Sequence, residues 1–121
     1  MIRLDANYIL RYLINDNEKM AIVAEKAILT QDVFISNEVL AEVVYVLNGV
    51  YGLSKEEISL GLLKLINLNN ISCLDKNIVI NALEIFGKKR LDFVDCLLCV
   101  YSTNDEVLTF DKKLLKCIEK K

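Results

Sequence analysis

Short apolar runs alternate with longer stretches of helical periodicity along this chain, and this alternation constrains the fold more than any other feature. Four short runs have the length and apolar character of buried strands. They cover residues 2–5, 32–36, 71–74 and 106–110. The stretches between and after them place apolar residues at helical spacing, over residues 7–14, 18–29, 37–50, 54–67, 75–86, 93–103 and 112–119.

This order predicts an α/β protein, a three-layer α/β/α sandwich around a mainly parallel sheet of four or five strands. The chain has 121 residues, of which 54% are hydrophobic, and these suffice for one compact core. Residues 1–121 are therefore expected to form a single domain. In parallel sheets of this kind, ligands bind beyond the carboxyl ends of the strands.

Local sequence signals place several helix ends. Ser54 and Glu57 form a capping box, in which each side chain accepts from a backbone N–H group of the other residue. Asp75 is a suitable N-cap for the following helix, and Gly87 is placed to terminate it.

Four carboxylates interrupt the apolar stretches. Asp5 and Asp111 end two predicted strands, whereas Glu42 and Asp95 lie in predicted helices among apolar neighbours. A buried charge is costly unless it is paired or coordinates a metal ion, so a shared divalent cation would account for all four. Asp5 and Asp111 taken singly are equally explained as helix N-caps, and Asp92 is either a cap or a supporting acid.

The chain contains no histidine, which excludes a Ser-His-Asp or Cys-His enzyme and RNA hydrolysis by a histidine pair. Its four glycines match neither spacing of the glycine-rich phosphate loops. Carboxylate oxygens without histidine suit Mg²⁺ or Mn²⁺. Of the mechanisms considered, metal-dependent hydrolysis of a phosphate ester therefore remains. In it, a metal-activated water attacks phosphorus.

The four cysteines are interpreted as reduced core thiols, because a chain this apolar needs no disulfide and lacks the ligands of a zinc site. A net charge of −2 provides no strongly basic field for nucleic acid. The sequence has neither a secretory signal nor an apolar run of membrane-spanning length, so we expect a cytoplasmic protein without membrane contact.

Four segments together resemble the signatures of PIN domains, and most of all those of the VapC toxins of toxin–antitoxin pairs. They follow the family order over nearly the whole chain. The four segments are Leu4-Asp5-Ala6-Asn7-Tyr8-Ile9-Leu10-Arg11, Val39 to Leu47 around Glu42 with Ser36 before it, Asp92-Phe93-Val94-Asp95-Cys96-Leu97-Leu98, and Leu108-Thr109-Phe110-Asp111-Lys112-Lys113-Leu114. One departure is Ala6, which stands where threonine is frequent in the family.

The resemblance implies a Mg²⁺- or Mn²⁺-dependent endoribonuclease whose metal ligands and catalytic acids are Asp5, Glu42, Asp95 and Asp111. It also implies supporting roles for Asn7 and Thr109, a small antitoxin protein as partner, and a homodimer. Residues 40–50 and 54–68 contain more apolar residues than one buried helix face needs, and this excess also favours a homodimer.

Basic residues beside the acids would contact the phosphates of RNA, or are simply solvated charges. They are Arg11, Lys88, Lys89, Arg90, Lys112 and Lys113. Two other functions stay open: a catalytically silent PIN-like module that binds a protein partner, and a housekeeping RNA-processing nuclease.

Overall fold

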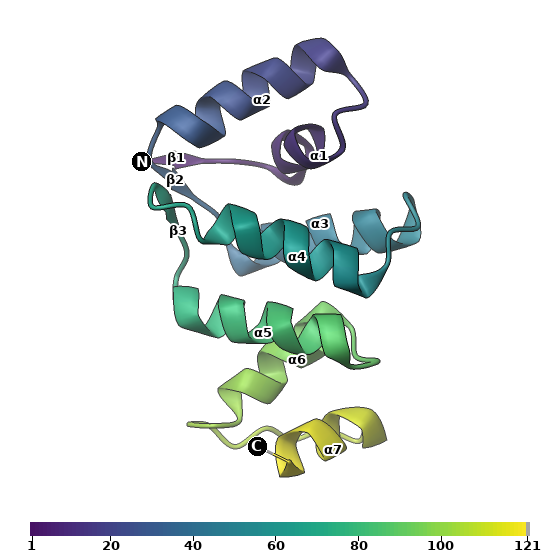
Figure 1. Cartoon of the computed structure of the whole chain (residues 1–121). Coiled ribbons are helices and arrows are strands. Elements are labelled where there is room, and N and C mark those ends of the chain that lie inside the picture. Colours follow the sequence, from purple (N-terminus) through teal and green to yellow (C-terminus); the bar gives the residue numbers. More distant parts are fainter. Residues whose placement is uncertain (121) are drawn as a thin grey trace.

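The computed structural model describes residues 1–120. Within them, seven helices and a three-stranded parallel sheet alternate along the chain, so the predicted α/β class and parallel sheet are confirmed (Figure 1). The elements are β1 (Ile2–Arg3), α1 (Ala6–Ile14), α2 (Glu18–Thr30), β2 (Val33–Phe34), α3 (Asn37–Gly49), α4 (Lys55–Ile66), β3 (Ile71–Ser72), α5 (Lys76–Lys88), α6 (Phe93–Tyr101) and α7 (Lys112–Glu119).

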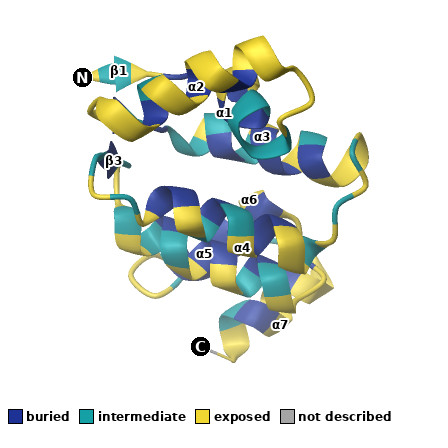
Figure 2. Cartoon of the chain, turned by 45° about the horizontal axis from the view of Figure 1, so that its top comes forward, coloured by how far each residue is buried: buried dark blue, intermediate teal, exposed yellow. Residues whose placement is uncertain are grey.

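The sheet has the order β1-β2-β3, with Ile2 beside Val33 and Val33 beside Ile71. Each strand is only two residues long. The helices therefore bury their apolar faces largely against one another, and α4 packs against both α3 and α5. One continuous core results, dark blue in Figure 2, which includes Ile9, Ile35 and Leu83.

The predicted fourth strand is wrong for this structure. Residues 106–110 form no strand, although three of the five are apolar, as expected for a short buried strand. The side chain of Leu108 is 87% exposed, and that of Phe110 is fully exposed. A strand needs a neighbouring strand to satisfy its backbone, and within residues 1–120 this segment has none. The sheet thus has three strands rather than four or five.

Most helix starts follow from the residue that precedes them. Ser54 and Glu57 make the predicted capping box, and Asp75 accepts hydrogen bonds from the backbone N–H groups of Asn77 and Ile78. The helix end predicted at Gly87 is wrong, because α5 continues to Lys88.

Gly87 serves close helix packing instead of helix termination. A Cβ atom built at Gly87 would lie 2.9 Å from both Cβ and Oγ of Ser59 on α4. Ser59 is buried, and its hydroxyl donates to the carbonyl oxygen of Leu83 at 2.8 Å, so it has little freedom to move aside. Gly87 therefore allows α5 to lie close against α4.

Alanine at two helical glycines should change stability in opposite directions. Gly87→Ala should lower the free energy of unfolding by about 1–3 kcal/mol, because the new methyl group overpacks the contact with Ser59. Gly61→Ala is the matched control, since nothing lies within 4 Å of its Cβ position, and it should raise the same quantity by roughly 0.5–1 kcal/mol. Urea denaturation of both variants measures the difference, and equal effects would contradict the packing argument.

The predicted dimer surface on α3 and α4 is largely occupied by the core. Ile58, Leu62, Leu65 and Ile66 of α4 are all buried within the chain. Leu60 is exposed there, as Tyr45 is on α3. The apolar excess of these two helices is therefore mostly a consequence of their central position, and it is weak support for a dimer through them.

Candidate functional site

The four predicted acids are less buried in the structure than the sequence suggested. Asp5, Glu42 and Asp111 are exposed, and Asp95 is half-buried. The expectation of four buried charges is therefore wrong. Glu42 lies among apolar neighbours in sequence, but its own side chain points to the solvent side of α3 between buried Leu40 and Val43. The cost of burying ionised carboxylates therefore does not by itself require a bound cation.

Three of the aspartates cap helices, which was the other explanation that the sequence allowed for them. Asp5 caps α1 through the N–H of Tyr8, and Asp92 caps α6 through the N–H of Asp95. Asp111 caps α7, where its Oδ1 accepts from the N–H groups of Lys113 and Leu114. Residues 106–110, which lead directly into Asp111, form no strand. Within residues 1–120 the second carboxylate oxygens of Asp5 and Asp111 accept no recorded hydrogen bond, so each retains a free ligand atom.

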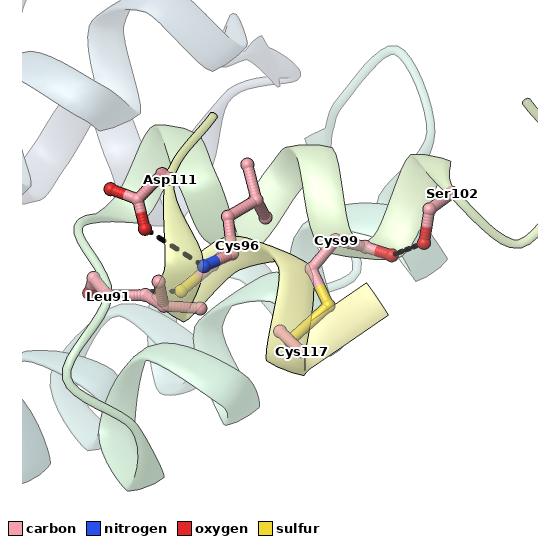
Figure 3. Close-up of a disulfide and its surroundings, with 7 residues drawn as sticks. Leu91, Cys96, Cys99, Ser102, Asp111 and Cys117 are labelled. Atoms are coloured by element: carbon pink, nitrogen blue, oxygen red, sulfur yellow. Dashed lines mark hydrogen bonds between the residues drawn. A yellow bond between two sulfur atoms is a disulfide. The ribbon is translucent and has the colours of Figure 1, made fainter. Parts of the chain in front are cut away.

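The helix starts of α6 and α7 bring Asp92, Asp95 and Asp111 near one another. Figure 3 shows Asp111 at the start of α7, in the same view as Leu91 and Cys96. Burial, followed by the negative charges of Asp92 and Asp111 and a hydrogen bond with Asp92, raises the pKa of Asp95 above its ordinary value. The three acids thus form one negative patch, here called the α6/α7 acidic patch.

The raised pKa of Asp95 predicts how stability depends on pH in metal-free buffer. The folded protein binds this proton more tightly than the unfolded chain, whose carboxyl pKa is 3.8. The free energy of unfolding therefore falls as the pH rises from that value through the higher folded pKa. Asp95→Asn should remove this penalty, so its gain in stability should grow with pH and then level off. Urea denaturation of both proteins between pH 3.5 and 7 measures the gain, and a gain independent of pH would contradict it.

Asp5 and Glu42 are not brought into the α6/α7 acidic patch. Among residues 1–120, no three acidic or thiol side chains gather closely enough to hold a metal ion. The donor chemistry fits a hard divalent cation, since the candidate ligands are all carboxylate oxygens. The arrangement within one chain does not fit, because it gives the ion too few ligands.

The supporting residues predicted beside the acids have defined positions. The hydroxyl of Thr109 accepts from the backbone N–H of Asp111 at 3.0 Å, which holds the turn into α7. Asn7 is exposed in the first turn of α1. The role of Thr109 is therefore to position the backbone of Asp111.

Five of the six predicted RNA-contacting residues flank the α6/α7 acidic patch along the chain. Lys88, Lys89 and Arg90 precede Asp92, and Lys112 and Lys113 follow Asp111, all exposed. Arg11 differs, because its guanidinium donates to Asp16 at 2.6 Å and to the hydroxyl of Tyr51 at 2.8 Å. Its bonds tie α1 to the turn before α2 and to the segment that follows α3, which is a structural role.

Lys55 was not singled out from the sequence, where it lies between the two residues of the capping box, Ser54 and Glu57. Its ammonium lies 3.6 Å from the centre of the Phe86 ring and donates to the carbonyl oxygen of Leu91. Burial lowers the pKa of this lysine. Lys55 also lines a cavity of about 410 Å³ beside Asp92, together with Tyr45 and Arg90. It therefore fixes the loop that leads into the acidic patch.

The prediction of four reduced thiols is wrong for two of them. Cys99 of α6 and Cys117 of α7 form a disulfide, with Cα atoms 6.1 Å apart (Figure 3). Helical periodicity alone could not reveal this pairing, which depends on how α7 packs. Cys96 stays a thiol, and burial raises its pKa to about 12, so it is protonated at neutral pH.

None of the helices in residues 1–120 has the length and apolar character needed to cross a membrane. No curated protein and no solved structure matches the chain. The family model of the PIN domain matches residues 2–120, nearly the whole chain. PIN domains are generally nucleases. Because the match covers nearly the whole chain, this chain belongs to the PIN domain family.

Proposed function

We propose that the chain is a divalent-metal-dependent endoribonuclease formed by a single PIN domain, and the toxin of a toxin–antitoxin pair. The observation that carries the proposal is the PIN match over residues 2–120, together with the influence of Asp92 and Asp111 on the carboxyl group of Asp95 and the exposed basic residues that flank these acids along the chain. RNA is the substrate and a small antitoxin is the inhibitor. The protein acts in the cytoplasm.

The carboxylates of Asp5, Glu42, Asp95 and Asp111 are proposed to hold Mg²⁺ or Mn²⁺, which requires them to lie closer together than they do in this structure. A divalent cation held there would polarise a phosphoryl oxygen of the substrate and would activate a water molecule for attack. The chain's own contribution is to place these carboxylates. Asp92 holds Asp95 through the first turn of α6, and Thr109 holds the backbone of Asp111.

Incubation of the purified chain with RNA, single-stranded DNA and a small phosphate ester tests this function. We expect cleavage of RNA alone, in Mg²⁺ or Mn²⁺, and none after chelation. Cleavage of DNA would indicate another nuclease. Absence of cleavage, with no stabilisation by Mn²⁺, would indicate the silent binding module.

The toxin assignment has its own test. Expression of the chain in bacteria should stop growth, and coexpression of a short adjacent gene for a DNA-binding partner should restore it. The Asp95→Asn variant is the control, because a growth defect that survives this change is not caused by cleavage. Unimpaired growth with the active wild-type enzyme would favour a housekeeping nuclease.

Lys112 and Lys113 are expected to contact RNA phosphates. Replacing both by serine should reduce the dependence of log affinity on log salt by about 1.4, since each phosphate contact on a single strand contributes about 0.7. The charge-matched control replaces exposed Lys19 and Lys64, which lie away from the acidic patch on α2 and α4. Fluorescence anisotropy with labelled RNA gives both slopes, and equal slopes would mean that the two lysines are only solvated charges.

A further inference from the structure

The cavity of about 410 Å³ lies where α3 packs against α6. Its lining also includes Lys55 of α4 and Phe86 of α5. A volume of this order lies within the range of roughly 300–1,000 Å³ that is typical of pockets for small organic groups. Because Asp92 is part of the lining, the cavity borders the α6/α7 acidic patch.

The lining of this cavity is mostly apolar, and one aromatic ring in it is accessible. Val44 and Phe93 are buried, whereas Tyr45 is 75% exposed and Val94 is also exposed. A tyrosine that packs in the core would not leave so much of its ring in contact with water. An accessible ring beside an apolar surface offers a flat face on which another aromatic group stacks. The lining therefore suits a planar, aromatic ligand.

Polar groups in the same lining suit a ligand that carries N–H groups and a negative charge. The amide Nδ2 of Asn48 donates to the carbonyl oxygen of Leu53 at 3.0 Å, and within residues 1–120 its Oδ1 accepts no recorded hydrogen bond. This oxygen is available to accept from an N–H group. Lys55 and Arg90 add positive charge, and Arg90 is exposed. The cavity thus combines a stacking surface, a hydrogen-bond acceptor and two cations.

The cavity adjoins both of the helices that carry predicted acids in their interior. Tyr45 follows Glu42 by three residues on α3, and both are exposed, so the two side chains share one face of the helix. On α6, Val94 of the lining directly precedes Asp95. A group attached to a ligand in the cavity is therefore close to the start of α6 and to the Glu42 face of α3.

We propose that this cavity binds one nucleobase of single-stranded RNA, which is splayed out of the strand and stacked on Tyr45. Unstacked bases of single strands bind proteins through aromatic side chains and hydrogen bonds to their edges. Arg90 then contacts a phosphate next to that nucleotide. RNA as the ligand rests on the proposed function, to which the cavity adds a means of selecting the nucleotide beside the cleaved bond.

Binding without metal tests this site, because chelation prevents cleavage during the measurement. The probes are fluorescently labelled RNA pentamers of adenylate, cytidylate and uridylate, and a labelled abasic pentamer with the same phosphates. Fluorescence anisotropy in EDTA should show that the wild type binds at least one base-bearing pentamer about 5- to 150-fold more tightly than the abasic one. Tyr45→Ala should abolish this difference, whereas Tyr45→Phe should keep it because the ring remains.

Leu74→Ala is the matched control, because Leu74 is 82% exposed and does not line the cavity. It should bind every pentamer as the wild type does. Equal affinity of the wild type for base-bearing and abasic pentamers would overturn the proposal. So would an unchanged preference in Tyr45→Ala, which is the outcome expected if the cavity holds a protein partner instead of RNA.

Photochemical cross-linking tests the location independently. A pentamer with a photoreactive analogue of the preferred base should form adducts within residues 41–49 or 90–94, identified by digestion and mass spectrometry. Adducts confined to other residues would overturn the site. Neither test requires metal or cleavage, so the two proposals can fail separately. RNA cleavage without base-dependent binding would refute only the nucleobase site, and base-dependent binding by an inactive protein would refute only the nuclease.

Discussion

Asp95→Asn should lower the rate of RNA cleavage at least about a hundredfold, while the metal-free protein becomes more stable at neutral pH. The loss follows because the substitution removes ligand charge with little change of shape, and a catalytic cation contributes several kcal/mol to the transition state. The gain follows because the ionised Asp95 is disfavoured in the folded protein by burial and by Asp92 and Asp111, which raise its pKa. A carboxylate that lowers the stability of the metal-free protein but is needed for activity is typical of a functional site.

Asp32→Asn is the matched control for this prediction. Asp32 is exposed before β2, and the structure shows only its backbone carbonyl in use, as acceptor from the N–H of Ile2. This variant should keep both the wild-type cleavage rate and the wild-type response to Mn²⁺. Cleavage by Asp95→Asn at the wild-type rate would remove Asp95 from the site.

Reduction of the disulfide between Cys99 and Cys117 should lower the free energy of unfolding by roughly 3 kcal/mol. The estimate comes from loop closure, because a cross-link over 18 residues restricts the unfolded chain by about this amount. The effect should be felt mainly at α7, a terminal helix of 8 residues whose buried side chains are Leu114 and Cys117.

Urea denaturation with and without dithiothreitol measures this effect, and Cys117→Ser should reproduce the reduced wild type. Cys73→Ser is the control, since Cys73 is a free thiol and its variant should retain the full response to reductant. If purified protein carries four free thiols under non-reducing conditions, the two cysteines are not bonded and the prediction is void.

The helix framework followed from the sequence because helix starts are set by local chemistry. Ser54, Asp75 and Asp92 each satisfy backbone N–H groups within three residues, so their roles are legible from spacing alone. Gly87 was wrongly predicted as a helix end because its role is not set by local chemistry. Its function depends on Ser59, which lies on another helix, and a single sequence does not reveal that contact.

The candidate site was predictable as a set of residues but not as an arrangement. Glu42 has apolar sequence neighbours, yet the rotation of α3 about its axis decides which residues face the core, and that rotation depends on α1, α4 and α6. Residues 106–110 have the apolar character of a short strand, but pairing requires an available edge. The pairing of Cys99 with Cys117 likewise depends on the docking of α7.

Titration calorimetry of the metal-free protein with Mn²⁺ tests the central claim most directly, because it asks whether these carboxylates bind a divalent cation at all. The wild type should bind Mn²⁺ with measurable heat, and Asp95→Asn should bind it at least about tenfold more weakly. Asp32→Asn should be indistinguishable from the wild type. A folded wild-type protein that takes up no Mn²⁺, or an Asp95→Asn variant that binds it equally well, would contradict the account.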